Sequence, residues 1–360
     1  VRLPGEGAPS AFSLAAVLAE AGRFAPPPPG EPTPISAVDY ALRWNPAAYR
    51  DLLIEAAEGL GVIHVPVHPE GIAPGAGDEI AAIRLAGGDL IAADLFIDCS
   101  GPAAQLIAAH PRFAFIDWSA SLPTRHVYLA APGAPRLALE DRLSLGAAGW
   151  LSAVAGRDGT HLMLGTAAPL SRAAAEAQLG SRATGMVNLT PGRVQAPWLG
   201  NVLALGDAAA RFEPLGPLHL DLAHRQLALL IELLPGRPIC AHERAEYNRR
   251  SVLMMEGVHE VLALHFAAPA AAAVFGARPL PGRAAEVIAP PYDVLNTAEA
   301  RAMAEGRPWS FLHISKPEID LPAGTDPYAP EVYAKAAENL KRMIDAGVLK
   351  QDEQACYYAY

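Results

Sequence analysis

Residues 203–224 hold the pattern in this sequence that carries the most chemistry. An apolar run ending at Leu205 is followed by Gly206 and Asp207, then by small residues and a segment with helical periodicity. A carboxylate at the carboxyl end of a buried strand lies where open α/β sheets bind ligands, and the next helix directs its N-terminal dipole there. Such an aspartate can accept a hydrogen bond from a sugar-alcohol hydroxyl. The alternative is purely structural, a capped helix after a buried strand.

Other residue types that carry chemistry form no complete pattern. His64 and His68 lie around a predicted strand, and His219 and His224 lie around the start of a predicted helix. Neither pair has a third ligand at metal-binding spacing, so surface or capping roles are favoured. No Gly-x-Ser-x-Gly motif or Cys/His arrangement indicates a nucleophile. We therefore expect no metal site and assign no catalytic residue.

Composition indicates a globular chain that avoids nucleic acid and membranes. The 360 residues are 51% hydrophobic and carry a net charge of −10, enough to bury at least one large core. Without a basic run the chain lacks the clustered Lys and Arg that bind nucleic acid. No apolar run reaches the roughly 18 residues that predict a membrane span. Three widely spaced cysteines and no recognisable signal peptide favour a cytoplasmic location.

The elements that must position Asp207 follow an α/β pattern. Asn45 and Pro46 predict the start of a helix with apolar residues at helical spacing, ending before Gly61. Apolar runs and turn glycines predict the remaining elements. These are a strand at 61–69, a hairpin around Gly87 and Gly88, a strand at 93–101 buried on both faces, an antiparallel substrate sheet within 125–190, and helices at 221–235 and 242–265.

The order of strand, Gly-Asp, small residues, Pro and Gly resembles the flavin end of flavoprotein hydroxylases. In that group the acid holds the ribityl chain of FAD, and the Pro-x-Gly turn packs under the isoalloxazine ring. The resemblance implies an α/β fold with a partial FAD-binding, Rossmann-like sheet. The residues that match are Gly206, Asp207, Ala208, Ala209, Pro214 and Gly216.

Three segments together are similar to the flavin-dependent tryptophan halogenases, in the same order as in that family. They are 94–107, 192–215 and 245–266, and the resemblance covers about residues 1–266. It implies FAD as cofactor, a flavin reductase that supplies reduced FAD, and an aromatic or other electron-rich substrate. The FAD-contacting residues that it implies are Ser100, Gly101, Gly206, Asp207, Ala208, Pro214, Leu215 and Gly216.

Several chemistry-bearing features of that family are missing. The family positions its halogenating species with a Lys, but every lysine here lies after residue 315. The family's Glu, which follows Glu-Pro-Leu, is replaced by Gly216. Its Trp-x-Trp-x-Ile-Pro signature keeps Trp150, while Ser152 and Ala155 replace the second Trp and the Pro.

The loop that should hold the pyrophosphate of FAD is also missing. A dinucleotide fingerprint needs Gly-x-Gly-x-x-Gly directly after a first strand. Gly5 and Gly7 are followed by Ser10 instead of a third glycine, and only four residues precede them. We interpret this segment as a chance match. Loss of an N-terminal part would explain the missing loop and lysine, but not Gly216 or the altered Trp signature.

The last part of the chain differs in character. A Pro/Ala/Gly-rich run without helix or strand period predicts a linker at 267–280. Residues 281–360, predicted as a small α+β unit, resemble the N-terminal part of the domain-of-unknown-function 1015 family, which implies no secure activity. We therefore expect an incomplete or impaired flavin-dependent halogenase or monooxygenase. The alternative makes 281–360 the functional part, as a small-molecule-binding or interaction module beside a relic flavoprotein.

Overall fold

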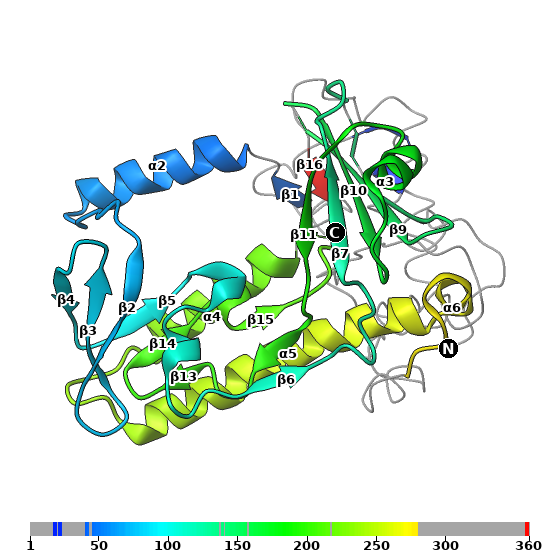
Figure 1. The fold of residues 1–360 in the computed structure, drawn as a ribbon. Helices are drawn as coiled ribbons and strands as arrows, with labels where there is room; N and C mark the ends of the chain where they lie inside the picture. Colours follow the sequence, from blue (N-terminus) through cyan, green and yellow to red (C-terminus); the bar gives the residue numbers. More distant parts are fainter. Residues whose placement is uncertain are drawn as a thin grey trace, which may run out of the picture.

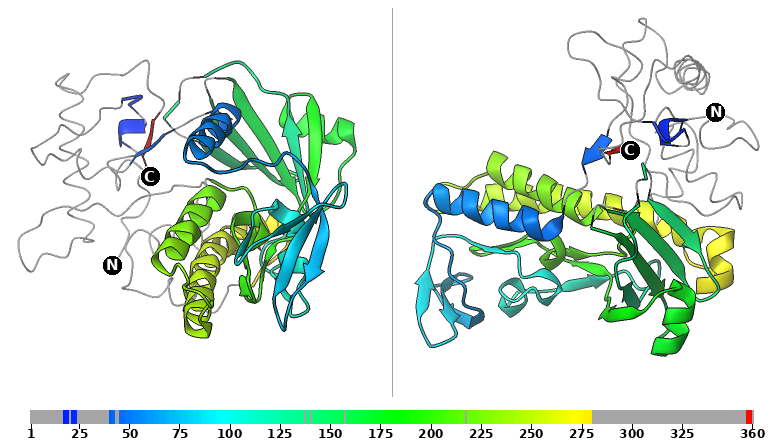
Figure 2. Two further views of the ribbon diagram at one scale, coloured as in Figure 1. Left: turned by 90° about the vertical axis from the view of Figure 1, so that its left-hand side faces the viewer. Right: turned by 90° about the horizontal axis from the view of Figure 1, so that it is seen from above.

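The computed structural model describes residues 17–19, 21–23, 40–42, 45–136, 138–139, 141–156, 158–216, 218–279 and 357–359, with backbone alone at 40–42 and 357–359. The sequence candidates at Gly5, Gly7 and Ser10, and residues 280–356, lie outside the described residues. Figure 1 shows an α/β half and an antiparallel sheet, with one long helix, α5, running along both. Figure 2 gives two further views of this arrangement.

A short parallel sheet forms the centre of the α/β half. Strands β14 (Val202–Ala204) and β5 (Phe96–Asp98) run parallel, and β13 (Trp198–Leu199) pairs antiparallel on the other side of β14. Helices α4 (Leu218–Glu232) and α5 (Ala241–Ala267) pack on each other, and α5 contacts β13. The predicted α/β class is therefore confirmed, with helix ends displaced by a few residues.

A five-stranded antiparallel sheet forms the second half, as the strand-like runs within 125–190 predicted. Its order is β11-β7-β10-β9-β8, and helix α3 (Arg172–Leu179) packs on it through Ala175 and Leu179. The Oγ of Ser171 caps this helix by accepting a hydrogen bond from the amide of Ala174. The strands are β7 (His126–Ala130), β8 (Arg142–Leu145), β9 (Trp150–Ala155), β10 (Thr160–Thr166) and β11 (Ala183–Asn188).

Two three-stranded antiparallel sheets complete the described strands of these halves. The predicted hairpin is confirmed, because β3 and β4 pair around Gly87 and Gly88, whose φ angles of 101° and 93° favour glycine. The strand predicted at 61–69 is wrong, since pairing begins only at Pro69. The bounds are β2 (Pro69–Pro74), β3 (Ile80–Leu85) and β4 (Leu90–Ala92), then β6 (Phe115–Asp117), β12 (Gly192–Val194) and β15 (Ala210–Arg211).

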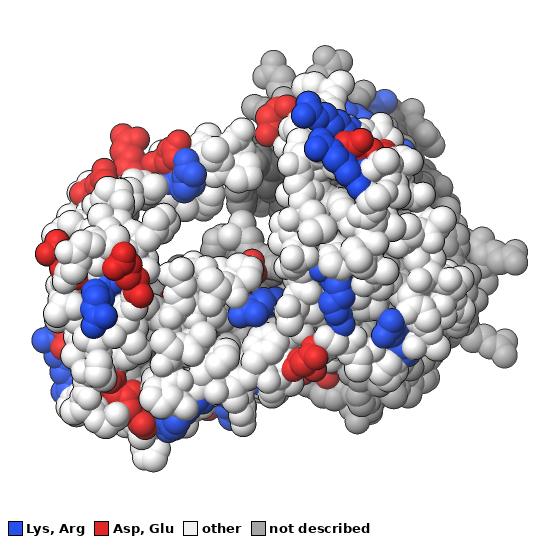
Figure 3. All heavy atoms as spheres, in the orientation of Figure 1, with Lys and Arg blue, Asp and Glu red and all other residues white. Residues whose placement is uncertain are grey.

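Helix α2 (Pro46–Gly59) begins where the sequence predicted, but it buries nothing. Asn45 Oδ1 accepts hydrogen bonds from two amides of the first turn, which is the expected cap. Leu52 and Leu53, which the helical spacing placed on an apolar face, are 60% and 49% exposed. Figure 3 shows an opening between α2 and the body of the protein. The apolar face of α2 therefore has no covering layer among the described residues.

Strand β5 is open on one side. The amide of Phe96 donates to Asn201 O, and Asp98 O accepts from the amide of Leu205, so both of these residues turn their backbone groups toward β14. Because backbone direction alternates along a strand, the N–H and C=O of Ile97 point to the opposite edge. No described strand pairs there. The side chain of Ile97 is also 43% exposed, so the prediction that this strand is buried on both faces is wrong.

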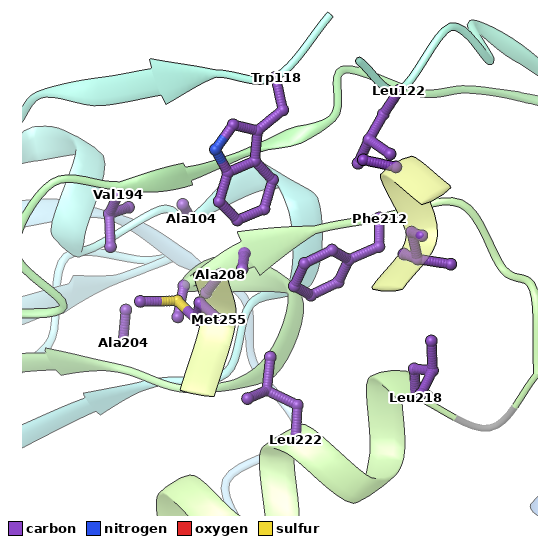
Figure 4. Close-up of a cluster of buried hydrophobic side chains, with 14 of the residues drawn as sticks. Ala104, Trp118, Leu122, Val194, Ala204, Ala208, Phe212, Leu218, Leu222 and Met255 are labelled. Atoms are coloured by element: carbon purple, nitrogen blue, oxygen red, sulfur yellow. The ribbon is translucent and has the colours of Figure 1, made fainter. Parts of the chain in front are cut away.

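The main hydrophobic core lies between the two halves and α5. Trp118, Phe212, Leu222 and Met255 converge there from different elements, as Figure 4 shows. The predicted linker at 267–280 contains helix α6 (Pro269–Phe275), whose Phe275 packs edge-on against the aromatic ring of Phe266. The expectation of a run without helix is therefore wrong, because its apolar residues join the core.

Two further observations concern the ends and the helices. Strand β1 (Tyr40–Leu42) pairs antiparallel with β16 (Tyr357–Ala359). Within the described ranges, no single helix has the length and apolarity needed to cross a membrane. Among the described helices, α5 and α6 taken together meet those two criteria, and they are bent by 82° at their break.

Candidate functional site

The turn that follows β14 places Asp207 at the carboxyl edge of the parallel pair. Gly206 has a φ of 59° and begins a single 3-10 turn, η5 (Gly206–Ala208). Its amide donates to Oε1 of Gln226, which is buried on α4 and itself donates to Oγ of Ser251 on α5. The loop is therefore fixed to both helices. The Asp207 side chain is 39% exposed and so is accessible to a ligand.

The turn that follows β5 lies beside it. Here η3 (Gly101–Ala103) contacts η5, which brings Ser100 and Gly101 close to Asp207. The buried Asp98 carboxylate organises this turn by accepting hydrogen bonds from Ser100 N and Ser100 Oγ at 2.9 and 2.5 Å. It also accepts from the amides of Leu106 and Ile107 at 2.8 and 2.9 Å. Four donors on one buried carboxylate make this turn rigid.

Two basic side chains flank Asp207. His219, near the start of α4, has its Nδ1 2.8 Å from Asp207 Oδ1, and its ring meets Phe212 edge-on. Arg211 lies over the ring of Phe115, and burial lowers the pKa of its guanidinium while the Asp207 charge opposes that shift. The Nε2 atom of His219 and the Nε atom of Arg211 are buried without a hydrogen-bond partner.

A buried carboxylate lies just beyond this cluster. Glu213 is fully buried, and its Oε1 accepts a hydrogen bond from the amide of Thr124 at 3.2 Å. Trp150 donates from Nε1 to Oγ1 of the same threonine at 2.9 Å. Burial raises the pKa of Glu213 to about 7, despite the opposing charge of Arg125. Its Oε2 has no partner, so Glu213 can hold a proton near neutral pH.

A second polar chain joins α5 to the loop after β6. His259 Nε2 lies 2.7 Å from Ser121 Oγ, and its Nδ1 lies 3.4 Å from Glu256 Oε2. Glu256 also accepts from Nε of Arg193 at 2.6 Å, and its pKa is lowered, chiefly by the neighbouring His259. The His259 ring stacks on Trp118 with centroids 4.3 Å apart. The amide of Ser121 donates to Trp118 O, so this amide is not free to stabilise a negatively charged oxygen of a reacting substrate. We therefore interpret these polar contacts as structural.

The predicted contact residues fall into two groups. In the first group, Ser100 and Gly101 lie beside the turn formed by Gly206, Asp207 and Ala208. The second group precedes α4 and consists of Pro214, Leu215 and Gly216. Leu215 is fully buried in the core, and Gly216 has a φ of 79°.

Sequence reasoning missed the side chains that complete the cluster. His219 was interpreted as a surface or capping residue, and Arg211 and Glu213 received no role. The signal for Glu213 was an acid inside an apolar stretch. The pairing of His219 with Asp207 spans twelve residues and depends on how the loop folds back on η5. Among the described residues, no group of three or more His, Cys, Asp or Glu side chains could hold a metal ion.

Two protein families match this chain, one after the other along the sequence. The model of the family described as tryptophan halogenase matches residues 5–273. The chain belongs to the tryptophan halogenase family. A second model, described as a protein of unknown function (DUF1015), matches residues 272–360. The two-family composition predicted from the sequence is thereby confirmed.

This chain aligns with only part of the length of two tryptophan halogenases. Tryptophan 7-halogenase RebH of Lentzea aerocolonigenes is 27% identical over 253 residues, which is 63% of this chain and 46% of RebH. Tryptophan 7-halogenase KtzQ of Kutzneria sp. (strain 744) is 28% identical over 204 residues, 52% of this chain and 38% of KtzQ. The chain therefore spans about half or less of the length of these relatives.

Solved structures of halogenases share the fold. BrvH, a flavin-dependent halogenase from Brevundimonas sp. BAL3, superposes with a TM-score of 0.76 at 24% identity, covering 96% of this chain and 77% of BrvH. The tryptophan 6-halogenase SttH from Streptomyces toxytricini gives 0.74 at 20% identity, covering 93% and 74%. These similarities establish the halogenase fold for this member of the family.

Proposed function

We propose that the halogenase-family part of this chain is the flavin-binding part of an FAD-dependent halogenase or monooxygenase, and that the chain as it stands does not halogenate. One observation carries the proposal. The Asp207 carboxylate is exposed at the carboxyl end of β14, next to the Ser100 turn of the parallel strand β5. Adjacent parallel strands in α/β sheets bind their ligands at this edge.

The residues fit only one half of FAD. Asp207 offers acceptor oxygens to the ribityl hydroxyls, because its side chain is 39% exposed at the carboxyl edge of the parallel pair. The pyrophosphate half lacks its usual partner, because the sequence contains no Gly-x-Gly-x-x-Gly. We infer that FAD binds weakly or not at all.

The residues that would act in catalysis also differ from those of a halogenase. No lysine precedes residue 316, Gly216 stands where the family's Glu is expected, and Ser152 and Ala155 interrupt the Trp signature. Among the described residues, no strand pairs with the free edge of β5 and no layer covers the apolar face of α2. These observations favour an incomplete or impaired enzyme.

The roles of the remaining residues follow from their contacts. A bound reduced flavin would supply the electrons that activate dioxygen. Asp207 would accept a hydrogen bond from the ribityl chain, and His219 would fix the direction of that carboxylate. Glu213, with its pKa near neutrality, would hold a proton at Oε2. A separate flavin reductase and an aromatic substrate complete the proposal.

Flavin content tests it directly. The full chain is purified with added FAD, and bound flavin is quantified from its visible absorbance. The protein is then supplied with a flavin reductase, halide and tryptophan, with RebH as positive control. We expect substoichiometric FAD and no halogenated product. Stoichiometric FAD together with halogenated product would show that the chain is a working halogenase.

The alternative function for residues 281–360 can be separated from this one. Limited proteolysis near 268–280, followed by ligand screening of both products, identifies which part folds and binds. A resistant C-terminal product that binds a ligand would favour the interaction or small-molecule module. Resistance of the front part alone would exclude it.

A further inference from the structure

Helix α4 is apolar on two sides. Its inner side packs into the core, for example through Leu222, which is 2% exposed. Its outer side carries Leu220, Leu227 and Ile231, whose exposed fractions are 41%, 42% and 67%. Leu234, two residues after the end of the helix, is 66% exposed. A helix at the surface of a protein usually has one apolar side, so a second apolar side indicates a further contact.

The exposed side chains at 220, 227, 231 and 234 form one stripe, which we call the outer stripe. Their steps of seven, four and three residues return to the same side of a helix. Beside the stripe, Asp221 and Arg225 pair with each other at 2.9 Å, and His224 is an exposed polar residue. An apolar centre with a polar rim is the usual anatomy of a protein interface.

The outer stripe is symmetric in sequence about Leu227. Leu220 and Leu234 lie seven residues before and after it, and Ala223 and Ile231 lie four residues before and after it. A two-fold axis at Leu227 sets two α4 helices antiparallel, with Leu227 against its own counterpart. Leu220 then faces Leu234 of the second copy, and the small Ala223 faces the large Ile231. The stripe is therefore complementary to itself, as a two-fold contact requires.

We propose that the outer stripe of α4 is a contact between two copies of this chain, related by a two-fold axis at Leu227. The exposed fractions in the stripe amount to about two whole side chains, so the symmetric contact removes the apolar surface of about four from water. A 15-residue helix is about 22 Å long, and two such helices alone bury less than the roughly 800 Å² per partner of a standard interface. We therefore expect a weak dimer, with a Kd of about 10 to 100 µM.

Sedimentation velocity of the full chain from about 1 to about 300 µM tests the proposal, because this range brackets the expected Kd. The sedimentation coefficient should rise with concentration. Leu227→Glu should weaken the dimer at least about tenfold, since it places two like charges at the axis. Leu53→Glu on α2 is the matched control, because Leu53 is 49% exposed and lies outside the stripe, and it should leave the Kd unchanged. Circular dichroism verifies that each variant keeps its helices.

Charge exchange tests the register. Leu227→Lys alone should also weaken the dimer, but an equal mixture of Leu227→Glu and Leu227→Lys should restore it, because this position faces itself. In an antiparallel pair, Leu220→Glu mixed with Leu234→Lys should associate as well. Leu220→Glu mixed with Leu220→Lys should not, since these positions lie at opposite ends of the contact.

Three outcomes would overturn the proposal. The first is a chain that stays monomeric up to the highest concentration. The second is a dimer that survives Leu227→Glu or loses as much affinity in Leu53→Glu, because the contact would then lie elsewhere. The third is a mixture of the Leu227→Glu and Leu227→Lys variants that remains monomeric. None of these measurements uses flavin, so they are independent of the proposed function.

Discussion

Replacing Glu213 with Gln should change how the stability of this protein depends on pH. The carboxyl group is fully buried, and only one of its oxygens has a partner, the amide of Thr124. A glutamine keeps an acceptor oxygen for that amide and carries no charge at any pH. The substitution therefore removes the ionisation and retains the shape and the hydrogen bond.

The magnitude follows from the raised pKa. Burial moves the pKa of Glu213 from an ordinary 4.5 to about 7. The folded protein thus binds more protons than the unfolded chain between these values, so stability from this group is present below the lower value and is lost as pH rises to the higher one. At about 1.4 kcal/mol per pKa unit, the full loss is about 3 kcal/mol.

Urea unfolding from about pH 5 to about pH 8, followed by tryptophan fluorescence, measures this difference. The free energy of unfolding of Glu213→Gln minus that of the wild type should rise by about 2 to 3 kcal/mol across this range. Glu232→Gln is the control, because Glu232 is exposed and its pKa is lowered by Arg250. Its difference should not rise in the same window.

A flat difference between Glu213→Gln and the wild type would refute the reasoning. It would mean that Glu213 has the same pKa in the folded and unfolded chains, which requires either solvent or an additional partner at Oε2. A fall with rising pH would mean that the folded protein stabilises the carboxylate, the opposite of what burial without a partner predicts.

Three further predictions concern packing and buried polar groups. Gly165→Ala should destabilise the protein by at least about 3 kcal/mol in urea unfolding, since the added Cβ would lie 2.0 Å from Cε2 of the buried Trp150. Gly185→Ala is the control, because a Cβ at that position meets nothing within 4 Å. Asp98→Asn should cost about 3 kcal/mol, because an amide group opposes two of the four donors, and Asp94→Asn at the exposed Arg237 pair should cost less than about 1 kcal/mol. Leu53→Glu on α2 should change the unfolding free energy by less than about 0.5 kcal/mol, and a larger loss would show that this face is covered.

Local signals in the sequence predicted the elements whose determinants are local. The cap at Asn45, the turn at Gly87 and Gly88, and the strand and turn leading to Asp207 all depend on residues within a few positions of one another. The structure places each of them as predicted. The family resemblance, which predicted the overall α/β class, likewise depended on motifs within short segments.

Features that depend on distant contacts could not be predicted in this way. The apolar spacing of α2 implied a buried face, but whether a layer covers that face is decided elsewhere in the fold. The run at 267–280 shows no helical period, because α6 has only seven residues and most of them are alanine. Such a short helix depends on tertiary packing, here of Phe275 on Phe266, which the local sequence does not show. The polar partners of Asp207 depend on a loop closing back onto η5.

The geometry of the Asp207 turn depends more on buried side chains than on the sheet beneath it. Among the described strands, β5 pairs with β14 alone, through three residues. The constraint comes instead from Asp98, which binds four donors, from Gln226, which ties Gly206 to α5 through Ser251, and from Asn201, which exchanges two hydrogen bonds with the backbone of Ile80. Removing one of these groups leaves a buried donor or acceptor unpaired, which costs more than the lost bond itself. These contacts therefore fix the shape of the Asp207 turn without requiring a further strand beside β5.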